Sequence, residues 1–488
     1  MSEQTTAFKP SLGLLDATMV VAGSMIGSGI FIVSADVTRH VGSAGWLIAV
    51  WVITGFMTVI AAVSYGELSA MYPKAGGQYV YLKEAFNPLV GFLYGWSFFA
   101  VIQTATIAAV GVAFSRFTAY FIPAFSEKNI LLTIGSDPGF KISAAQLVSI
   151  AVVILLTYIN TRGIKAGKTI QTIFTSTKLL ALFGLIIFGF LLVKESFWSA
   201  NWSNGFAAAQ DLGSKDSVGS LMPTSWQNIG GVALLGAIAA SMTGTVFSSD
   251  AWNNVTFIAG EIKNPKRNVG LSLFFGTLLV SVIYVTTNLM YLHVLPIDKV
   301  AFPQEERLAV AAANVIFGSA GRSIIAVLIM VSTFGCINGL VLAGARVYYT
   351  MALDGLFFKP AGKLNKNAVP QWSLWAQCVV AALLCLSGSY GQLLDMISFV
   401  AVAFYVLTIA GIFVLRKKRP DIERPYKAFG YPVMPFIYII MGTVFCVLLI
   451  IYKPNYTWPG LIITLIGIPI YYIAVSGKKD KMSDSSIH

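Results

Sequence analysis

Charged residues are scarce in this sequence. Asp, Glu, Lys and Arg make up only 11% of its 488 residues, whereas 56% are hydrophobic. Because a soluble protein carries about 25% charged residues, the composition excludes an ordinary soluble globular protein. Apolar stretches of roughly 20 residues, the length that crosses a bilayer, recur along the whole chain. The chain is therefore predicted to be an all-α polytopic membrane protein.

Residues that form metal sites, disulfides or catalytic centres are also rare. The three histidines are scattered, and the HExxH and GxSxG motifs do not occur. The cysteines lie within apolar runs without metal-ligand spacing, so we interpret them as small hydrophobic packing residues: Cys336, Cys378, Cys385 and Cys446. We expect no metal, no cofactor and no enzyme activity.

Positive charge is in excess, with 33 Lys and Arg residues against 21 Asp and Glu. The resulting net charge of +12 could indicate a nucleic-acid partner. However, the basic residues lie in short loops between the apolar runs, which is the placement that the positive-inside rule produces. No nucleic-acid partner is therefore expected, and membrane lipids surround the chain.

Twelve apolar runs predict twelve transmembrane helices. They cover residues 11–38, 43–70, 88–121, 142–161, 168–193, 229–260, 269–295, 320–350, 371–388, 392–416, 432–452 and 456–476. If both termini are cytoplasmic, 22 of the 33 Lys and Arg residues fall in inner loops and tails, and 9 in outer loops. This bias predicts a multi-pass protein of the plasma (inner) membrane with cytoplasmic tails 1–10 and 477–488. The polar segment 194–228 is expected to be an extracellular loop.

Small residues interrupt the first apolar run at "GSMIGSG", residues 23–29. Glycine is a poor helix former, and a helix break at membrane depth is tolerated only where it is buried in protein or lines a wet cavity. A second interruption lies five runs later, in "TGTVFSSDAW", residues 243–252. Interrupted helices at equivalent positions of two five-helix halves are typical of the central binding site of a secondary transporter.

The two breaks suit an α-amino acid. The N–H groups of Gly27, Ser28 and Gly29 can bind a carboxylate, because glycine permits close approach. Carbonyls near the breaks can accept hydrogen bonds from an ammonium group; those expected to do so belong to Ser24, Met25, Phe247 and Ser248. The alternative is a small-xxx-small packing face, which accounts for the first break and not for the second.

These stretches resemble the amino acid–polyamine–organocation superfamily and, within it, the L-type amino-acid transporter family. The resemblance covers nearly the whole chain. It is carried by "GSMIGSGIF" and by the segments "YGELSAMYPKAGGQYVYLKEAFNPLVGFLYGW" (65–96), "DAWNNVTFIAGEIKNPKRN" (250–268), "FGCINGLVLAGARVYYTMALDG" (334–355) and "RPYKAFGYPVMP" (424–435).

The resemblance implies a LeuT-type fold, with spans 1 and 6 unwound at mid-membrane. Five helices (11–193) would be followed by an inverted repeat of five (229–416) and by two further spans (417–476). It also implies amino-acid transport, commonly by exchange. In that family the span 1 "GSG" backbone, here Gly27, Ser28 and Gly29, holds the substrate carboxylate, and an aromatic residue of span 6, here Phe247, closes over the substrate. Ile26 is expected to add to an apolar pocket. Ala251 departs from the glycine that is common in relatives, and Leu340 from a small or hydroxylated residue.

Partners are implied by the same resemblance. Eukaryotic members are disulfide-linked to a single-span heavy chain through a cysteine between spans 3 and 4. Segment 122–141 has no cysteine here. The chain therefore resembles a bacterial member that works without this heavy chain.

Lys178 lies ten residues beyond Lys168 and so about 15 Å into the membrane. An ionisable residue at this depth is a functional hypothesis by default, the alternative being a purely structural lysine. In L-type relatives a lysine of span 5 resembles a built-in substitute for the Na⁺ of sodium-coupled members. Lys178 matches that position, and we expect its ammonium group to tie span 1 to spans 5 and 8 through hydrogen bonds to backbone carbonyls or hydroxyls, with Ser332 and Thr333 as the candidates in span 8.

The residues after Phe247 have open alternatives. Asp250 is expected to cap the second half of span 6, and it could instead attract a cationic substrate or a proton. Ser248 and Ser249 are expected to do similar work for the backbone. Trp252 is either structural or part of a gate.

The sequence thus predicts Na⁺-independent exchange of neutral L-amino acids by alternating access. The alternative within the same fold is a carrier of cationic amino acids or polyamines, or a proton-coupled carrier. A channel or a membrane-embedded enzyme is the disfavoured alternative from another class.

Overall fold

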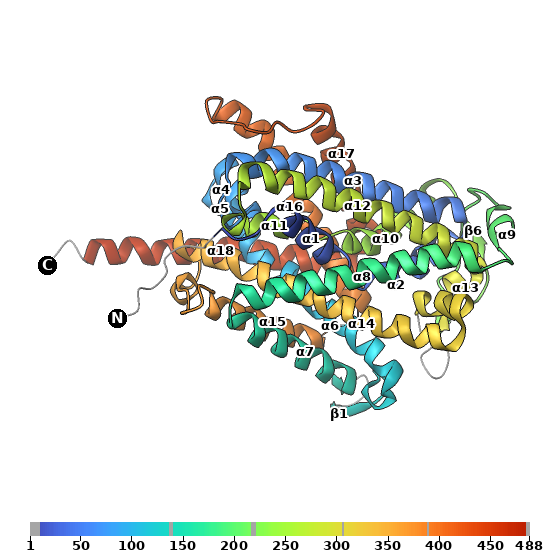
Figure 1. Ribbon diagram of the computed structural model, residues 1–488. Coiled ribbons are helices and arrows are strands. Elements are labelled where there is room, and N and C mark those ends of the chain that lie inside the picture. The colour runs from blue at the N-terminus through green and yellow to red at the C-terminus, as the bar shows by residue number, and fades with distance from the viewer. Residues whose placement is uncertain (1–9, 136–139, 216–220, 305–306, 388–389, 485–488) are drawn as a thin grey trace.

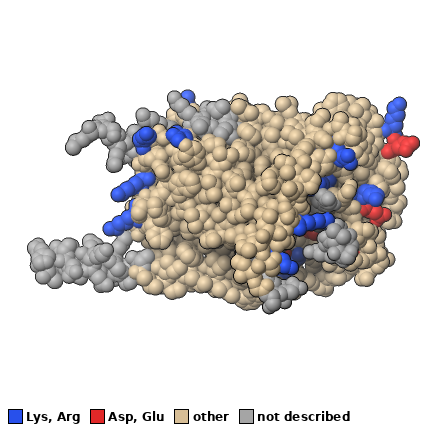
Figure 2. Space-filling view, turned by 90° about the horizontal axis from the view of Figure 1, so that it is seen from below, with Lys and Arg blue, Asp and Glu red and all other residues tan. Residues whose placement is uncertain are grey.

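The computed structural model describes residues 10–135, 140–215, 221–304, 307–387 and 390–484. It is a bundle of helices whose long members run in a roughly common direction (Figure 1). On the face that Figure 2 shows, charged residues gather toward the two ends, with a broad uncharged band between them. This distribution suits a protein whose middle is surrounded by lipid.

The first half of the chain contains nine helices in the described residues. Their bounds are α1 (Leu14–Met25), α2 (Gly29–Val41), α3 (Ala44–Met71), α4 (Gln78–Ala85), α5 (Pro88–Ser97), α6 (Gln103–Phe121), α7 (Ala144–Thr161), α8 (Ile164–Leu192) and α9 (Trp198–Trp202). A π-helical turn, Phe98–Ile102, joins α5 to α6.

The second half continues with α10 (Gly231–Ser248), α11 (Asn254–Phe257), α12 (Pro265–Val294), α13 (Ile297–Ala301), α14 (Leu308–Leu353), α15 (Gln371–Ser387), α16 (Tyr390–Lys418), α17 (Val433–Tyr452) and α18 (Pro454–Asp484). Short 3-10 turns lie at Pro123–Phe125, Ala259–Glu261 and Lys359–Gly362.

Within the described residues, the strands form three two-stranded antiparallel sheets. The pairs are β1 (Ile130–Ile134) with β2 (Phe140–Ser143), β3 (Ala209–Gln210) with β6 (Gln227–Asn228), and β4 (Ser214–Lys215) with β5 (Leu221–Met222). All of them lie in loops between helices, and none of their residues belongs to the buried hydrophobic core.

Each of the twelve predicted apolar runs coincides with one or more helices. In the described residues, nine helices are long and apolar enough to cross a membrane, or ten if the bent pair α1–α2 is counted as one span. Helices α15 and α18 have shorter apolar stretches. The prediction of a polytopic helical membrane protein is therefore confirmed.

Local sequence signals set several helix ends. Ser143 and Gln146 form a capping box at the start of α7. Asn87 accepts a hydrogen bond from the N–H of Val90, with Pro88 in the first turn of α5. Gly42, with φ of 57°, ends α2 in the left-handed conformation that glycine adopts without strain.

The first break separates α1 from α2. The helix stops at Met25 and resumes at Gly29, and the two parts are bent by 43°. Between them Ile26 has an extended backbone. The helix direction therefore changes between Met25 and Gly29, inside the segment 23–29 in which an interruption was predicted.

The second break is shorter than the predicted interruption at residues 243–252, because the chain stays helical through Ser248. Helix α10 ends at Ser248, and helical structure resumes only at Asn254. Ala251 has φ of 62°, a left-handed conformation in which a helix cannot continue. Beyond it the chain forms a single α-helical turn and a 3-10 turn, not a continuous half-helix.

The two breaks lie against each other. A Cβ atom added to Gly29 would meet Ser248 at 1.9 Å from Oγ and 2.9 Å from Cα. The hydroxyl of Tyr284, in α12, lies 3.0 Å from the carbonyl oxygens of both Met25 and Ser248. Helix α12 therefore connects the ends of α1 and α10.

A buried ion pair closes one end of the bundle. Arg346 Nε lies 3.2 Å from Glu261 Oε1, and both side chains are buried. The carbonyl of Glu261 also accepts hydrogen bonds from the backbone N–H groups of Ser11 and Leu12. The segment before α1 is thus fixed to the segment before α12 and, through Arg346, to α14.

Removal of Arg346 should therefore destabilise the fold. We expect Arg346→Leu to lower the free energy of unfolding by roughly 3–5 kcal/mol, because the Glu261 charge would be left buried without its partner. The measurement is reversible unfolding in mixed micelles. Lys266→Leu is the control, since its pair with Glu423 is exposed and should be worth about 0–1 kcal/mol. Equal stability of the two variants would contradict the role given to Arg346.

Candidate functional site

The carbonyl groups freed by the first break are bound by Lys178. Its ammonium group, buried in α8, donates to the carbonyl oxygens of Gly23 at 2.7 Å and Ile26 at 2.6 Å. A charge at membrane depth is stable only with such partners. The lysine therefore supplies hydrogen bonds that the missing turn of helix cannot supply.

Helix α14 contributes two further contacts to the same segment. Ser332 Oγ lies 3.4 Å from the Ile26 carbonyl oxygen, and Cys336 Sγ lies 3.3 Å from that of Ser24. Residues four apart share one face of a helix, so Ser332 and Cys336 approach α1 together. The sequence analysis expected Ser332 to bind the Lys178 ammonium group itself, whereas its hydroxyl contacts the Ile26 carbonyl that Lys178 also binds. The contact of Cys336 was missed, although the spacing of four was available as a signal.

The expectation for Thr333 was wrong. Its hydroxyl donates to the carbonyls of Ile329 and Met330 in its own helix. One residue beyond Ser332 is a rotation of about 100° around the helix, which directs the Thr333 side chain elsewhere. Thr333 is therefore not a partner of the Lys178 ammonium group, whose hydrogen bonds go to Gly23 and Ile26.

The carbonyls expected to receive an ammonium group already have protein partners. Met25 and Ser248 accept from Tyr284, and Ser24 accepts from Cys336. The Phe247 carbonyl accepts from the N–H of Asp250 at 3.2 Å. Each carbonyl oxygen has two lone pairs, so the contacts of Met25 and Ser248 with Tyr284 leave capacity for a second donor at these two carbonyls. Sequence reasoning missed Tyr284, whose signal was a hydroxyl in the middle of an apolar helix.

Asp250 does not cap a helix, contrary to the sequence prediction. Helix α11 begins at Asn254 and has Asn253 at its N-cap position. Instead, the buried carboxylate of Asp250 accepts a hydrogen bond from the hydroxyl of Tyr405 in α16. The left-handed residue Ala251 separates Asp250 from α11, and this turn explains why the cap does not form.

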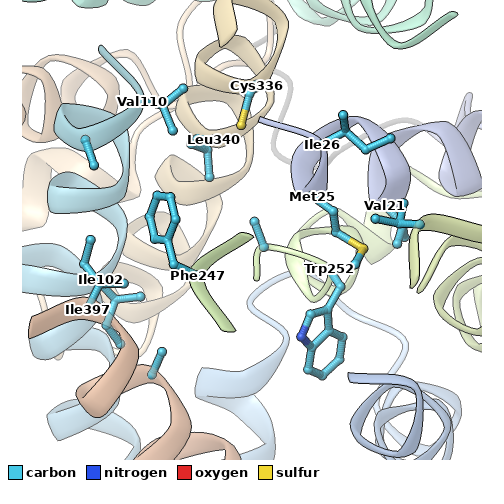
Figure 3. Packing of buried hydrophobic residues seen from close by; sticks show 14 of the residues in the cluster. Val21, Met25, Ile26, Ile102, Val110, Phe247, Trp252, Cys336, Leu340 and Ile397 are labelled. Atoms are coloured by element: carbon cyan, nitrogen blue, oxygen red, sulfur yellow. The ribbon is translucent and has the colours of Figure 1, made fainter. Parts of the chain in front are cut away.

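Several aromatic side chains pack around the second break. The Trp252 ring lies edge-on to Tyr65 at 4.7 Å between centroids, and its centroid lies 5.2 Å from that of Tyr405. In Figure 3, Phe247 lies on the side of Leu340 and Ile102, while the Met25 side chain points toward Trp252. Phe247 and Trp252 are both buried, so the two breaks are covered by apolar and aromatic side chains.

A narrow internal cavity lies next to the second break. Its lining includes Asp250, Ala251, Leu340 and Gln103, whose side-chain amide donates to the Leu340 carbonyl at 2.6 Å. A second cavity, lined among others by Ser249 and Trp252, shares Asp250 and Tyr405 with the first. Both cavities are small. The volume within which the centre of a water molecule can move is about 10 Å³ in the first cavity and about 20 Å³ in the second, so each has room for about one water.

The predicted site residues fall into two groups, those that line the first cavity and those that do not. Asp250 and Ala251 line it, whereas none of residues 24–29 does. The space over Gly27 is close to Cys336, and that over Gly29 is filled by Ser248. No group of three or more His, Cys, Asp or Glu side chains that could hold a metal occurs in the part of the chain that the structure describes.

Comparison with known proteins agrees with this architecture. The family model described as amino acid permease matches residues 12–475. Large neutral amino acids transporter small subunit 2 of Homo sapiens is 30% identical over 476 residues, which cover 96% of this chain and 81% of the relative. Asc-type amino acid transporter 1 of Mus musculus is 29% identical over 480 residues, covering 97% and 83%.

A third relative, b(0,+)-type amino acid transporter 1 of Oryctolagus cuniculus, is 28% identical over 425 residues, covering 87% of this chain and 80% of the relative. The match to the family model covers nearly all of the chain, both breaks and the residues around them included. The chain therefore belongs to the amino acid permease family, within the amino acid–polyamine–organocation superfamily: it is a multi-pass membrane transporter of amino acids and not an enzyme.

Proposed function

We propose that this protein exchanges neutral L-amino acids across the plasma membrane by alternating access and independently of Na⁺. The observation that carries the proposal is the Lys178 ammonium group, which binds the carbonyls of Gly23 and Ile26. A fixed cation at the break makes a bound metal cation unnecessary there. The relatives named for neutral amino acids support the substrate class.

The proposal includes the number of spans, the two repeats and the sidedness that the sequence predicts. Helices α15 and α18, added to the nine long helices and the bent pair α1–α2, complete twelve spans of a LeuT-type fold. Residues 11–193 and 229–416 form the two inverted five-helix repeats, and 417–476 the last two spans. The tails are cytoplasmic and segment 194–228 is extracellular, in keeping with the positive-inside count.

The substrate is held by backbone groups of both breaks. Its carboxylate binds the N–H groups of Gly27, Ser28 and Gly29 at the start of α2, where the helix dipole favours negative charge. Its ammonium group binds carbonyl oxygens of Met25 and Ser248, through the lone pairs that Tyr284 does not use. Both charges of the zwitterion are thereby matched without an ionised side chain.

Apolar residues select the substrate side chain and cover it. Ile26, Phe247 and Ala251 are buried around the breaks, and Phe247 and Trp252 act as the covering aromatic residues. Because the cavity beside Ala251 has room for only about one water, substrate entry requires these side chains to move. Small to medium neutral side chains fit this space best.

A second candidate function is favoured by Asp250. This buried carboxylate lines both cavities, and its hydrogen-bond partner Tyr405 is neutral. A carboxylate in such a setting attracts a cation. A cationic amino acid, a polyamine or a coupled proton is therefore the alternative cargo.

We also propose that the transporter works without a disulfide-linked heavy chain. The curated relative from Homo sapiens bears the name of a small subunit. In this chain, segment 122–141 between the third and fourth spans has no cysteine, and the four cysteines lie in helices. No thiol is thus available in that loop for such a bond.

Substrate class is tested by competition in proteoliposomes. Unlabelled alanine, serine or leucine should inhibit exchange of a labelled neutral amino acid, because the site matches the zwitterion and offers an apolar surface to the side chain. Arginine and putrescine should inhibit weakly. Strong inhibition by these cations that disappears in Asp250→Asn would establish the second candidate function instead.

The contact between the breaks gives a second prediction. Gly29→Ala should impair exchange, because any Cβ at this position overlaps Ser248 and such overpacking costs roughly 1–3 kcal/mol. Gly29→Ala combined with Ser248→Gly should recover part of the activity, since Oγ and Cβ of Ser248 are removed. Gly184→Ala is the control, because a Cβ there meets nothing within 4 Å. Exchange by Gly29→Ala at the level of Gly184→Ala, with equal protein in the vesicles, would refute this account.

The role of Lys178 is tested by exchange in choline and in sodium buffer. The wild type should exchange equally in both. Lys178→Met keeps the unbranched shape and most of the length of the side chain and removes the charge. Its exchange should fall much more than its abundance, since a buried carbonyl left without a donor costs roughly 1–3 kcal/mol. Thr177→Ala, on the preceding residue, should be unaffected. An obligatory Na⁺ requirement of the wild type, or normal exchange by Lys178→Met, would contradict the proposal.

A further inference from the structure

The loop between α6 and α7 carries an exposed apolar hairpin. All five residues of β1 are exposed, and four of them are Ile or Leu: Ile130, Leu131, Leu132 and Ile134. Strand β2 pairs with β1 in antiparallel fashion. A strand normally buries one of its faces, whereas both faces of β1 are open here, so this hairpin lacks the protein core that apolar strands ordinarily cover.

The hairpin does not extend away from the bundle. Arg116, five residues before the end of α6, pairs with Glu127 at 2.8 Å, which returns the chain to the level of the last helical turn. The carbonyl of Asn129 then accepts a hydrogen bond from the N–H of Ala144, the first residue of α7, at 2.9 Å. Figure 1 shows β1 at the edge of the bundle, beside the end of α7.

The apolar surface continues from the hairpin onto the outside of α7. Leu147, Ile154 and Leu155 of this helix are exposed, each at 44–48% of its surface. In a membrane protein, exposed apolar residues of a spanning helix face lipid. The hairpin therefore extends the apolar, lipid-facing surface of α7 beyond the start of that helix.

We propose that the β1–β2 hairpin is an interfacial anchor that lies in the lipid leaflet around the ends of α6 and α7. Its Ile and Leu side chains enter the acyl region. Each strand has one unpaired edge, which the hydrocarbon core does not tolerate, so the strand backbone stays in the polar headgroup layer. Lys128 and Lys141, both exposed at the ends of the hairpin, lie where they can contact lipid phosphates.

This anchor has a mechanical role in the proposed exchange cycle. It fixes the end of α7 at a defined depth in the membrane, and α7 packs on α6 and α14, the helix that contacts the first break. The anchor itself depends only on the exposed apolar surface. It would hold for any cargo, so its test is separate from tests of transport.

Site-directed spin labelling of the full-length protein tests the proposal. Leu131→Cys is labelled in a Cys446→Ala background, because the other three cysteines are buried. The protein is reconstituted in vesicles of phosphatidylcholine and phosphatidylglycerol. The readout is the collision rate of the label with oxygen, which concentrates in lipid, relative to that with a water-soluble nickel complex.

Two control positions define the scale. Leu155→Cys, on the exposed side of α7, reports lipid, and Leu212→Cys, which is equally exposed but lies in segment 194–228, reports water. We expect a several-fold excess of oxygen over nickel collisions at position 131, as at 155. Ile134→Cys repeats the measurement in case the first variant does not fold.

Two results would overturn the anchor. Nickel collisions as frequent as at position 212 would place the hairpin in water. Low collision rates with both reagents would show that protein covers it, either a second copy of this chain or another partner. In that case cross-linking of the labelled position would identify which.

Discussion

Every backbone carbonyl inside the membrane requires a donor, and the break after Met25 removes the donors that a continuous helix would provide. The structure meets this requirement with side chains from three other helices: Lys178 of α8, Ser332 and Cys336 of α14, and Tyr284 of α12. Because each of these helices must approach the break to within hydrogen-bond distance, the break fixes their mutual positions. The site is thus organised around its missing turn of helix.

Sequence reasoning recovered the part of this arrangement that local chemistry determines. Glycine and serine clusters at residues 23–29 mark a weak point of a helix, and a lysine ten residues into an apolar run has to find acceptors. Helix starts such as that of α7, with its capping box at Ser143, depend only on neighbouring residues. These features do not require knowledge of which helices meet.

What sequence reasoning missed depends on long-range packing. Tyr284 is separated by 259 positions from Met25, and Tyr405 by 155 from Asp250. One sequence contains no information on which of many tyrosines meets which break. Asp250 was predicted as a cap because it follows the break directly. The left-handed turn at Ala251 displaced the next helix by a few residues, and the carboxylate then bound the nearest hydroxyl.

The position of Tyr284 has a consequence for symmetry between the two halves of the site. A phenol has one proton, yet its oxygen lies at the same 3.0 Å from the carbonyls of Met25 and Ser248. At any instant one carbonyl accepts that proton and the other does not. The two arrangements differ by a rotation of a single O–H bond, with every heavy atom in place. A donor that binds one carbonyl makes that oxygen a weaker acceptor for the phenol and so favours the arrangement in which the proton points to the other carbonyl. Binding at one half of the molecule is thereby transmitted to the other without any movement of the backbone.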